Sequence, residues 1–357
     1  MKSKKSLFQQ LADIVPPPFS KGMSVTDIID AMGQTCFEAR NLFRGAMLYK
    51  RMVDEGDTIW MGIAGAGIAG GMGGMVSSLM EAGCIDVICS TGAQVYHDLH
   101  FAFGLPVKAI SPFCDDNALR NHGDTRIYDI GIREKETLEA QDRIIRTFVR
   151  ECYRESFLKA SIASWEFNYA LGRWVNQQAP FPERSFIACA ARQNIPVFWD
   201  SLANHSIAMN LVATDREGYP IQFSAQKDVW DSAAIVYSAN QTGFVELGGG
   251  GPKNFIQQTG PTISQILKKE YEGAERGLQI GTAVEKEGSL SSCTFGESVT
   301  WGKYRSDNEE KLVQIWSEYS LVFPILSAFL LENCEKRPSK QLIPRMNLFA
   351  DKLGDGE

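Results

Sequence analysis

Apolar residues follow two periods along this chain, and the alternation between them predicts the fold. Residues 25–52 carry apolar side chains near helical spacing, as at Ile28, Met32 and Leu48, and are predicted to be helical. Short apolar runs then alternate with helical segments. The predicted strands are Thr58–Ile63, Ile85–Cys89, Ile195–Asp200, Thr242–Leu247, Leu278–Ala283 and Lys311–Trp316. This alternation, with no all-β section, predicts an α/β, Rossmann-like fold: a mainly parallel sheet covered by helices on both faces.

Composition along the chain predicts a single domain with extensions at both ends. Residues 1–25 are rich in lysine and proline and are expected to form an N-terminal arm rather than a packed element. Residues 26–345 contain no segment that reads as a linker, so they are expected to be one catalytic domain. Residues 346–357 are set apart as a C-terminal tail. Within the domain, the aromatic-rich stretch 152–174 is predicted to be helical.

Overall composition narrows the class of protein. Of 357 residues, 44% are hydrophobic and 22% charged, which is typical of a globular protein with a large core. The net charge of −7 argues against nucleic acid as the main partner. No apolar run reaches the roughly 18 to 20 residues of a membrane span. The eight cysteines form no Cys-x-x-Cys pair and have no histidine at ligand spacing, which favours a reducing cytoplasm and no metal site.

A glycine-dense stretch follows the first predicted strand. Gly65, Gly67 and Gly70 satisfy the spacing G-x-G-x-x-G between a strand and a helix, the arrangement of a dinucleotide-binding turn. Because so many glycines satisfy many patterns, a tight turn without a ligand is the alternative. The acidic residue usually found about 20 residues further on is not evident. The ribose of any dinucleotide must therefore be held in another way.

The segment Gly296–Lys303 is the strongest candidate for chemistry. A lysine attacks a carbonyl or imine only as the neutral amine, and an apolar wall such as Trp301 favours that form. Glu297 is suited to hold a cationic substrate, with a cation–π face on Trp301 beside it. The alternative for Lys303 is a solvated side chain at the end of an element.

Four segments together resemble one known family. They are Ser90–Ala93 with His97–Leu99, Gly248–Gly250 followed by Lys253, Gly296–Lys303, and Leu321–Pro324. They fall in the order seen in deoxyhypusine synthase, and the resemblance extends from about residue 26 to about residue 332. It is greatest to the bacterial deoxyhypusine synthase-like branch, in which Gly-Gly-Gly-x-Pro-Lys-Asn-Phe replaces a two-histidine version.

The resemblance implies an NAD-dependent transferase. In that family NAD oxidises spermidine, an active-site lysine holds the butyl-imine, and an acceptor amine receives the group: a lysine of a translation factor, or putrescine in homospermidine synthases. It also implies a homotetramer with active sites between subunits. By position, Lys303 matches the imine-forming lysine, and the substrate pocket matches Glu297, Trp301, Ser206 and Asn254. The cofactor positions are Gly65, Ala66, Ala69, Thr91, Gly92, Ala93, Asn204, Gly248, Gly249, Gly250, Thr282, Gly288 and Glu318, the last replacing an aspartate.

Departures from the family pattern concern the substrate pocket. Asn254 stands in place of a histidine, and an amide cannot shuttle protons as an imidazole does. Leu290 stands in place of an aspartate that grips the far amine, and Met209 or Asn210 in place of another. Spermidine as donor and a protein lysine as acceptor are both placed in doubt. Transfer to a free amine is therefore the first hypothesis, modification of a translation-factor lysine the second, and a non-catalytic NAD-binding homologue the third.

Three further residues have open roles. His97 is expected to be structural or part of a cofactor loop, with proton transfer as the minor alternative. Asp98 can cap the following helix or touch a ligand. Lys253 is either a structural partner or a second nucleophile.

Overall fold

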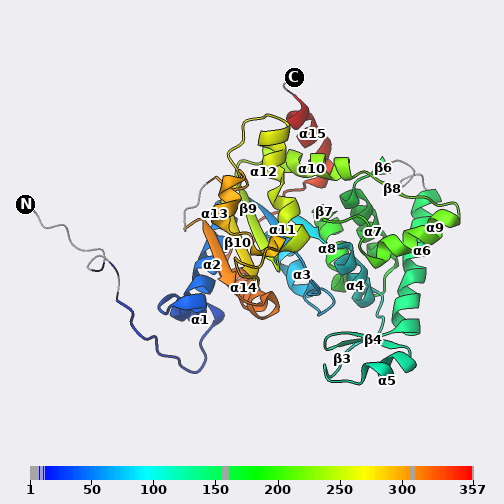
Figure 1. Cartoon of the computed structure of the whole chain (residues 1–357), viewed down its shortest axis with the longest axis horizontal. Helices are drawn as coiled ribbons and strands as arrows, with labels where there is room; N and C mark the ends of the chain where they lie inside the picture. The colour runs from blue at the N-terminus through cyan, green and yellow to red at the C-terminus, as the bar shows by residue number, and fades with distance from the viewer. Residues whose placement is uncertain (1–7, 9–10, 12, 155–160, 306–309, 356–357) are drawn as a thin grey trace, which may run out of the picture.

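The computed structural model describes residues 8, 11, 13–154, 161–305 and 310–355. Its centre is a six-stranded sheet of order β11-β10-β9-β1-β2-β7, in which every neighbouring pair is parallel (Figure 1). The strands are β1 (Thr58–Ile63), β2 (Val87–Ser90), β7 (Val197–Trp199), β9 (Thr242–Leu247), β10 (Arg276–Gly281) and β11 (Leu312–Trp316). The predicted α/β fold with a mainly parallel sheet is confirmed.

Helices surround this sheet. They are α1 (Val25–Gly33), α2 (Phe37–Asp54), α3 (Gly73–Glu81), α4 (Gly92–Ala102), α5 (Asp116–Asn121), α6 (Ala140–Arg154), α7 (Ser164–Gln178), α8 (Phe186–Gln193), α9 (Ser206–Arg216), α10 (Ala225–Ser238), α11 (Gly250–Gln257), α12 (Thr259–Pro261), α13 (Phe295–Thr300), α14 (Tyr319–Asn333) and α15 (Met346–Gly354). Short π-helical turns cover Glu134–Glu139 and Thr262–Ile266, and short 3₁₀ turns cover Pro182–Arg184, Leu290–Ser292 and Ile343–Arg345.

Both faces of the sheet are buried because its strands alternate between two cores. In β1, Ile59 and Met61 belong to one apolar cluster and Trp60 to the other. The first cluster takes side chains from α2, α3 and α14, and the second from α10, α11 and α15. Strands covered on both faces read as continuous apolar runs, which is why their positions could be predicted from the sequence.

The order in which strands are added to the sheet reverses between the parallel neighbours β1 and β9. After β1, the strands β2 and β7 extend the sheet on one side, and β9, β10 and β11 then extend it on the other. In an open parallel sheet, ligands bind beyond the carboxyl ends of the strands at such a switch point. The loops after β1 and β9 are therefore the place where a binding site is expected.

Two predicted segments differ in the structure. Residues 152–174 were predicted to be helical, and the structure describes α6 as far as Arg154 and α7 from Ser164, with residues 155–160 outside the described ranges. The prediction is wrong for the short strand β6 (Ser161–Ile162), which pairs with β8 (Gln222–Phe223) just before α7. Most of the described aromatic residues of this stretch belong to α7. The expectation of no all-β section is also wrong, because β3 (Val107–Ala109), β5 (Ile130–Arg133) and β4 (Asp124–Ile127) form a small antiparallel sheet away from the main one (Figure 1).

The N-terminal segment has no helix or strand in residues 13–23, whereas the C-terminal segment forms a packed helix. Residues 13–23 project away from the body of the molecule before the chain enters α1, while the predicted arm's first residues lie largely outside the described ranges (Figure 1). Residues 346–354, expected to be part of a tail, form α15, whose Met346, Phe349 and Leu353 are buried in the second core. In the described part of the chain, no helix has both the length and the apolar character to cross a bilayer.

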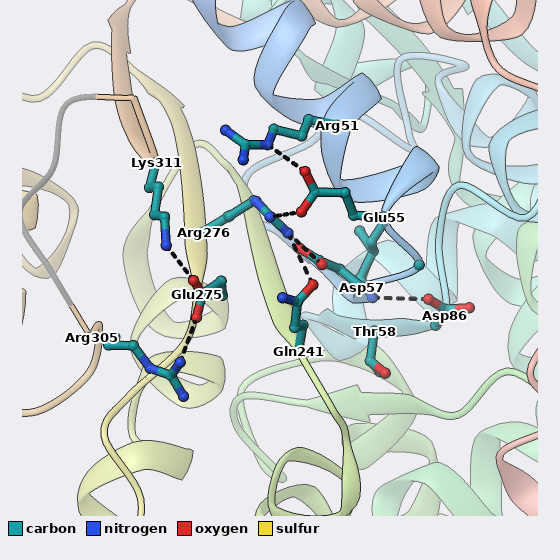
Figure 2. Close-up of polar contacts among 12 residues, drawn as sticks. Arg51, Glu55, Asp57, Thr58, Asp86, Gln241, Glu275, Arg276, Arg305 and Lys311 are labelled. Carbon is teal, nitrogen blue, oxygen red and sulfur yellow. Dashed lines mark hydrogen bonds and ion pairs between the residues drawn. The ribbon is translucent and has the colours of Figure 1, made fainter.

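An ion network closes the amino-terminal edge of the sheet, opposite the predicted ligand edge (Figure 2). Arg276, at the start of β10, donates to Asp57 at 2.5 Å and to Glu55. Asp86 accepts from the Ile59 N–H at 2.9 Å and from Arg337 at 2.6 Å. The Arg276 and Asp57 side chains are 2% and 0% exposed, so this pair is buried rather than solvated.

Candidate functional site

Lys303 is held rigidly at the backbone. Helix α13 is capped by Thr294, whose hydroxyl accepts from the Glu297 N–H at 3.1 Å, and it ends at Thr300. Gly302 then turns the chain with φ of +69°, a conformation that L side chains rarely adopt. The Lys303 N–H donates to Ser298 O at 3.1 Å, and its carbonyl accepts from the Ala274 N–H at 3.0 Å. The side chain therefore leaves from a backbone fixed on both sides.

A cavity of about 720 Å³ lies beside the Lys303 side chain. The Lys303 Nζ donates to Asn254 Oδ1 at 3.4 Å across it. Of the residues expected to form the reactive pocket, the structure brings Lys303, Glu297, Trp301 and Asn254 to this one cavity. Trp301 is 60% exposed, so its ring is open to a ligand.

Further residues line the same cavity. Leu290, expected in the substrate pocket, lies here, and so does Gly288, which was expected at the cofactor. Glu285 provides a second carboxylate in addition to Glu297. Gln257 and Cys293 also line it, and neither stood out in the sequence. Two carboxylates, an indole face and an amine in one cavity suit a ligand with more than one ammonium group.

A buried polar cluster adjoins the cavity through Gln257. The Glu246 carboxylate, at 0% exposure, accepts from Gln257 Nε2 at 2.7 Å and from the Tyr304 hydroxyl at 2.9 Å. Gln257 in turn accepts from the Ser298 hydroxyl at 3.4 Å. Burial raises the pKa of Glu246 and raises that of Tyr304 well above its ordinary value. The only sequence signal for this cluster was a charged residue inside an otherwise apolar strand.

Lys253 is a buried ammonium rather than a cavity-facing amine. Its Nζ donates to Gln279 Oε1 at 2.8 Å, to Ser291 O at 3.4 Å and to Cys293 O at 2.6 Å. Three acceptors match the three donors of a protonated amine. Burial nevertheless lowers the Lys253 pKa. These contacts give Lys253 a structural role, because they fix the loop between β10 and α13, which forms a wall of the Lys303 cavity.

The expected glycines meet at the switch point of the sheet. Gly248, Gly249 and Gly250 follow β9 with φ of +78°, +75° and +64°. A Cβ on Gly249 would lie 2.8 Å from Ser291, so the turn needs glycine for space as well as for conformation. The Gly250 N–H donates to the Ser291 hydroxyl at 2.9 Å. Backbone brought this close to a strand end is the arrangement that accommodates a dinucleotide.

Two adjoining cavities open at this edge. One, of about 290 Å³, is lined by Gly65, Gly248, Thr282, Glu287 and Glu318 among others. The other, of about 750 Å³, is bounded by residues 65–72 and by the small antiparallel sheet, and it shares Gly65 and Glu318 with the first. Ala66 and Ala69, both expected at the cofactor, line the larger one. The cradle of glycines and the Glu318 carboxylate fit a dinucleotide.

Tyr319 organises the glycine-rich loop and was not anticipated. Its hydroxyl accepts from the Gly67 N–H at 2.9 Å and donates to Ala64 O at 2.8 Å. A Cβ on Gly67 would lie 2.6 Å from that hydroxyl, so glycine is required there by packing. The Ile68 N–H is bound by Gln94 at 2.8 Å. Part of the glycine pattern therefore serves close packing, the alternative left open from the sequence.

The remaining expected residues lie at the ends of β2 and β7, outside the linings of these three cavities. Thr91 caps α4 by accepting from the Gln94 N–H at 3.2 Å, and Gly92 and Ala93 form that helix's first turn. A Cβ on Gly92 would lie 2.3 Å from the His205 ring, so the loop holding Asn204 and Ser206 packs directly on this turn. These residues share the ligand edge of the sheet, but not the Lys303 cavity, within the part of the chain that the structure describes.

The two positions considered for a lost aspartate differ in environment. Asn210 is buried and engaged, accepting from Arg146 at 2.8 Å and donating to Asp142 at 2.7 Å. Met209 is 71% exposed on the same helix, α9. Met209 is thus the one of the two that offers its side chain to a ligand or another molecule.

Of the two α4 residues whose roles were open, Asp98 is buried and His97 is half-buried. His97 Nδ1 lies 3.0 Å from His100 Nε2, and burial lowers the pKa of His97 to about 4 and that of His100 to about 3. Asp98 caps α8, a helix distant in sequence, by accepting from the Phe186 N–H at 3.0 Å. Of the two roles left open for Asp98, the structure supports helix capping, but the capped helix is α8 and not the helix that follows α4 in the chain.

Comparisons with known proteins agree with this arrangement. Residues 27–330 match the model of the deoxyhypusine synthase family. The chain is 32% identical to the deoxyhypusine synthase-like protein of Nostoc punctiforme, over 98% of this chain and 90% of that one. It is 36% identical to a Methanosarcina mazei protein assigned as deoxyhypusine synthase 2, over 87% and 88%.

Solved structures support the fold. An Entamoeba histolytica protein assigned as a deoxyhypusine synthase superposes with a TM-score of 0.60 at 16% identity, over 92% of this chain and all of that one. At that identity the likeness concerns the fold alone. The family match and the full-length relatives settle the classification: this chain belongs to the deoxyhypusine synthase family.

Proposed function

We propose that this protein is an NAD-dependent transferase that moves an aminobutyl or related alkylamine group from a polyamine, such as spermidine, to an acceptor amine through an imine on Lys303. The observation that carries the proposal is the single cavity in which the Lys303 amine, two carboxylates and an exposed indole lie together. The glycine-lined cofactor edge adjoins it through the loop 282–293.

Each group in the cavity contributes to this chemistry. Lys303 is the nucleophile that forms the imine. Glu297 and Glu285 seat the ammonium groups of the donor, and Trp301 covers one of them with its ring. Leu290 contributes an apolar wall for the alkyl chain. When bound at the glycine edge, with Gly248, Gly249 and Glu318 holding it, NAD would supply hydride transfer to and from the amine-bearing carbon.

A free amine is the favoured acceptor, as in homospermidine synthesis. Asn254 lies 3.4 Å from the Lys303 amine, at the position where a histidine would assist proton transfer in modification of a translation factor. An amide at that distance can orient the amine by accepting from it, but cannot take up its proton.

The proposal extends to the cellular compartment and the oligomeric state of the protein. All eight cysteines are free thiols, which favours the reducing cytoplasm. We expect a homotetramer with active sites between subunits. Large apolar side chains exposed in the single chain are compatible with such contacts, among them Met209 at 71% and Val212 at 61% on α9 and Leu321 at 67% on α14.

The decisive experiment is intact-protein mass spectrometry after incubation with NAD and either spermidine, putrescine or related amines, followed by borohydride. Wild type is expected to gain a mass that identifies the transferred group. Lys303→Ala should not gain it, whereas Lys286→Ala, on the loop 282–293 but outside the cavity lining, should behave as wild type. Absence of any adduct, together with clear NAD binding and no NADH formed, would refute transfer and favour a non-catalytic NAD-binding protein.

A further inference from the structure

Glu246 is a carboxylate where the fold calls for an apolar side chain. In β9, Val245 and Leu247 belong to one core and Phe244 to the other. Glu246 alternates with Phe244, on the face covered by α11, and is 0% exposed. Burying a carboxylate is costly unless it is paired or hydrogen-bonded. Its position therefore needs a reason beyond packing.

Only one oxygen of this carboxylate is occupied. Oε1 accepts both from Gln257 Nε2 and from the Tyr304 hydroxyl. Oε2 is buried and has no hydrogen-bond partner among the described residues. Both donor residues are close to Lys303 in space or in sequence. Gln257 lines the Lys303 cavity, and Tyr304 is the next residue in the chain after Lys303.

Two amines lie near this buried carboxylate. Lys253 and Lys303 both favour the ionised form of Glu246 and lower its pKa, against the larger effect of burial, which raises it. Lys253 meets only neutral oxygens at its Nζ among the contacts of the described residues. The titratable groups facing this region are Lys253 on α11, Glu297 on α13, Cys293 on the preceding loop, and Lys303 and Tyr304.

We propose that Glu246 is a positioning residue for the proposed transfer: through Tyr304 and Gln257 it fixes the floor of the cavity, and it is the counter-charge for the cation carried by Lys303. The inference rests on the proposed function for its purpose, because a protonated imine keeps a positive charge on the Lys303 nitrogen. A buried carboxylate near that nitrogen stabilises the cation without moving, since Gln257 and Tyr304 hold it in place.

The test measures the pH profile of Lys303 acetylation by trace acetic anhydride, read by peptide mass spectrometry. Only the neutral amine attacks the anhydride, giving an amide, acetate and a proton. Glu246→Gln keeps the shape and removes the charge, so the half-maximal pH of Lys303 labelling should fall relative to wild type. Lys253→Met removes a positive charge and should move it in the opposite direction. Tyr304→Phe keeps both charges and should leave the midpoint near that of wild type.

The outcomes separate this inference from the proposed function. The labelling needs neither NAD nor polyamine, so it reports on Glu246 even if no transfer is found. An unchanged midpoint in folded Glu246→Gln overturns the inference, and so does a Lys303 that is never labelled. Should Glu246→Gln fail to fold, Glu246→Leu removes the charge with a side chain suited to this strand face and is read by the same criterion. In the transferase assay, Glu246→Gln should lower kcat more than it raises KM.

Discussion

Removing the Arg276 guanidinium tests whether the ion network of Figure 2 holds the amino-terminal edge of the sheet together. The change is Arg276→Met, which keeps length and apolar volume. It leaves Asp57, at 0% exposure, without its main partner. Loss of one member of a buried ion pair costs about 3 to 5 kcal/mol, because the other charge stays buried and unpaired. That is a large part of the roughly 5 to 15 kcal/mol that a domain has in total.

The matched control is Arg51→Ala, in the same network. Arg51 donates to Glu55 at 2.6 Å, but its side chain is 46% exposed. Exposed pairs contribute about 0 to 1 kcal/mol, so this variant should unfold close to wild type. Urea unfolding followed by circular dichroism at pH 7 gives both values from the midpoint and slope.

A pH series identifies the cause of the loss. Burial raises the pKa of Asp57 and Arg276 opposes that rise, so without Arg276 the folded-state pKa should be higher still. A carboxyl group whose pKa is raised on folding binds its proton more tightly in the folded state. The free energy of unfolding therefore rises as pH falls through that pKa. The deficit of Arg276→Met relative to wild type should shrink from pH 7 toward pH 5. A deficit below 1 kcal/mol at pH 7, or one that does not change with pH, would refute the reasoning.

Three more predictions concern the ligand sites and the core. Glu297→Gln should raise KM for the amine about 10- to 100-fold in steady-state assays, since a charged contact is worth about 1.5 to 3 kcal/mol, while NAD binding stays as in wild type. Gly249→Ala should weaken NAD at least about 10-fold by titration calorimetry, because φ is +75° and the new Cβ meets Ser291 at 2.8 Å. Burial raises the pKa of Asp98 to about 7, so its stabilising contribution is complete below pH 4 and is lost as pH rises through 7. Urea unfolding of Asp98→Asn should show its deficit against wild type shrinking between pH 5 and pH 8; a deficit that grows would contradict the assignment.

The sequence was most informative where one physical signal dominated. Thr58–Ile63 and Thr242–Leu247 were placed to the residue because strands buried on both faces are mostly apolar runs. The glycines after β9 were found at a strand end, and Lys303, Glu297 and Trp301 share a cavity as their spacing within one short segment indicated. Their roles stay predictions.

Other features depend on contacts distant in sequence, which local patterns do not encode. The three short strands of residues 107–133 are stabilised by one another, and none has a strong pattern alone. Tyr319 reaches Gly67 across 252 positions of sequence, and Glu246 reaches Tyr304 across 58. An aromatic or acidic residue gives no local sign of such a partner, so the organisation beneath both ligand cavities could only come from the structure.

The loop 282–293 separates the two ligand sites and belongs to both. Thr282 and Ser291 face the smaller glycine-lined cavity, whereas Glu285 and Cys293 face the amine cavity. With NAD and an amine bound as proposed, this one wall would have a different occupant on each side. If binding of one ligand shifts that wall, the binding free energy of the other ligand changes as well. Thermodynamic linkage makes this change equal in both directions. If NAD and an amine bind as proposed, saturating NAD should change amine affinity by the same factor by which saturating amine changes NAD affinity, with this loop as the element that couples them.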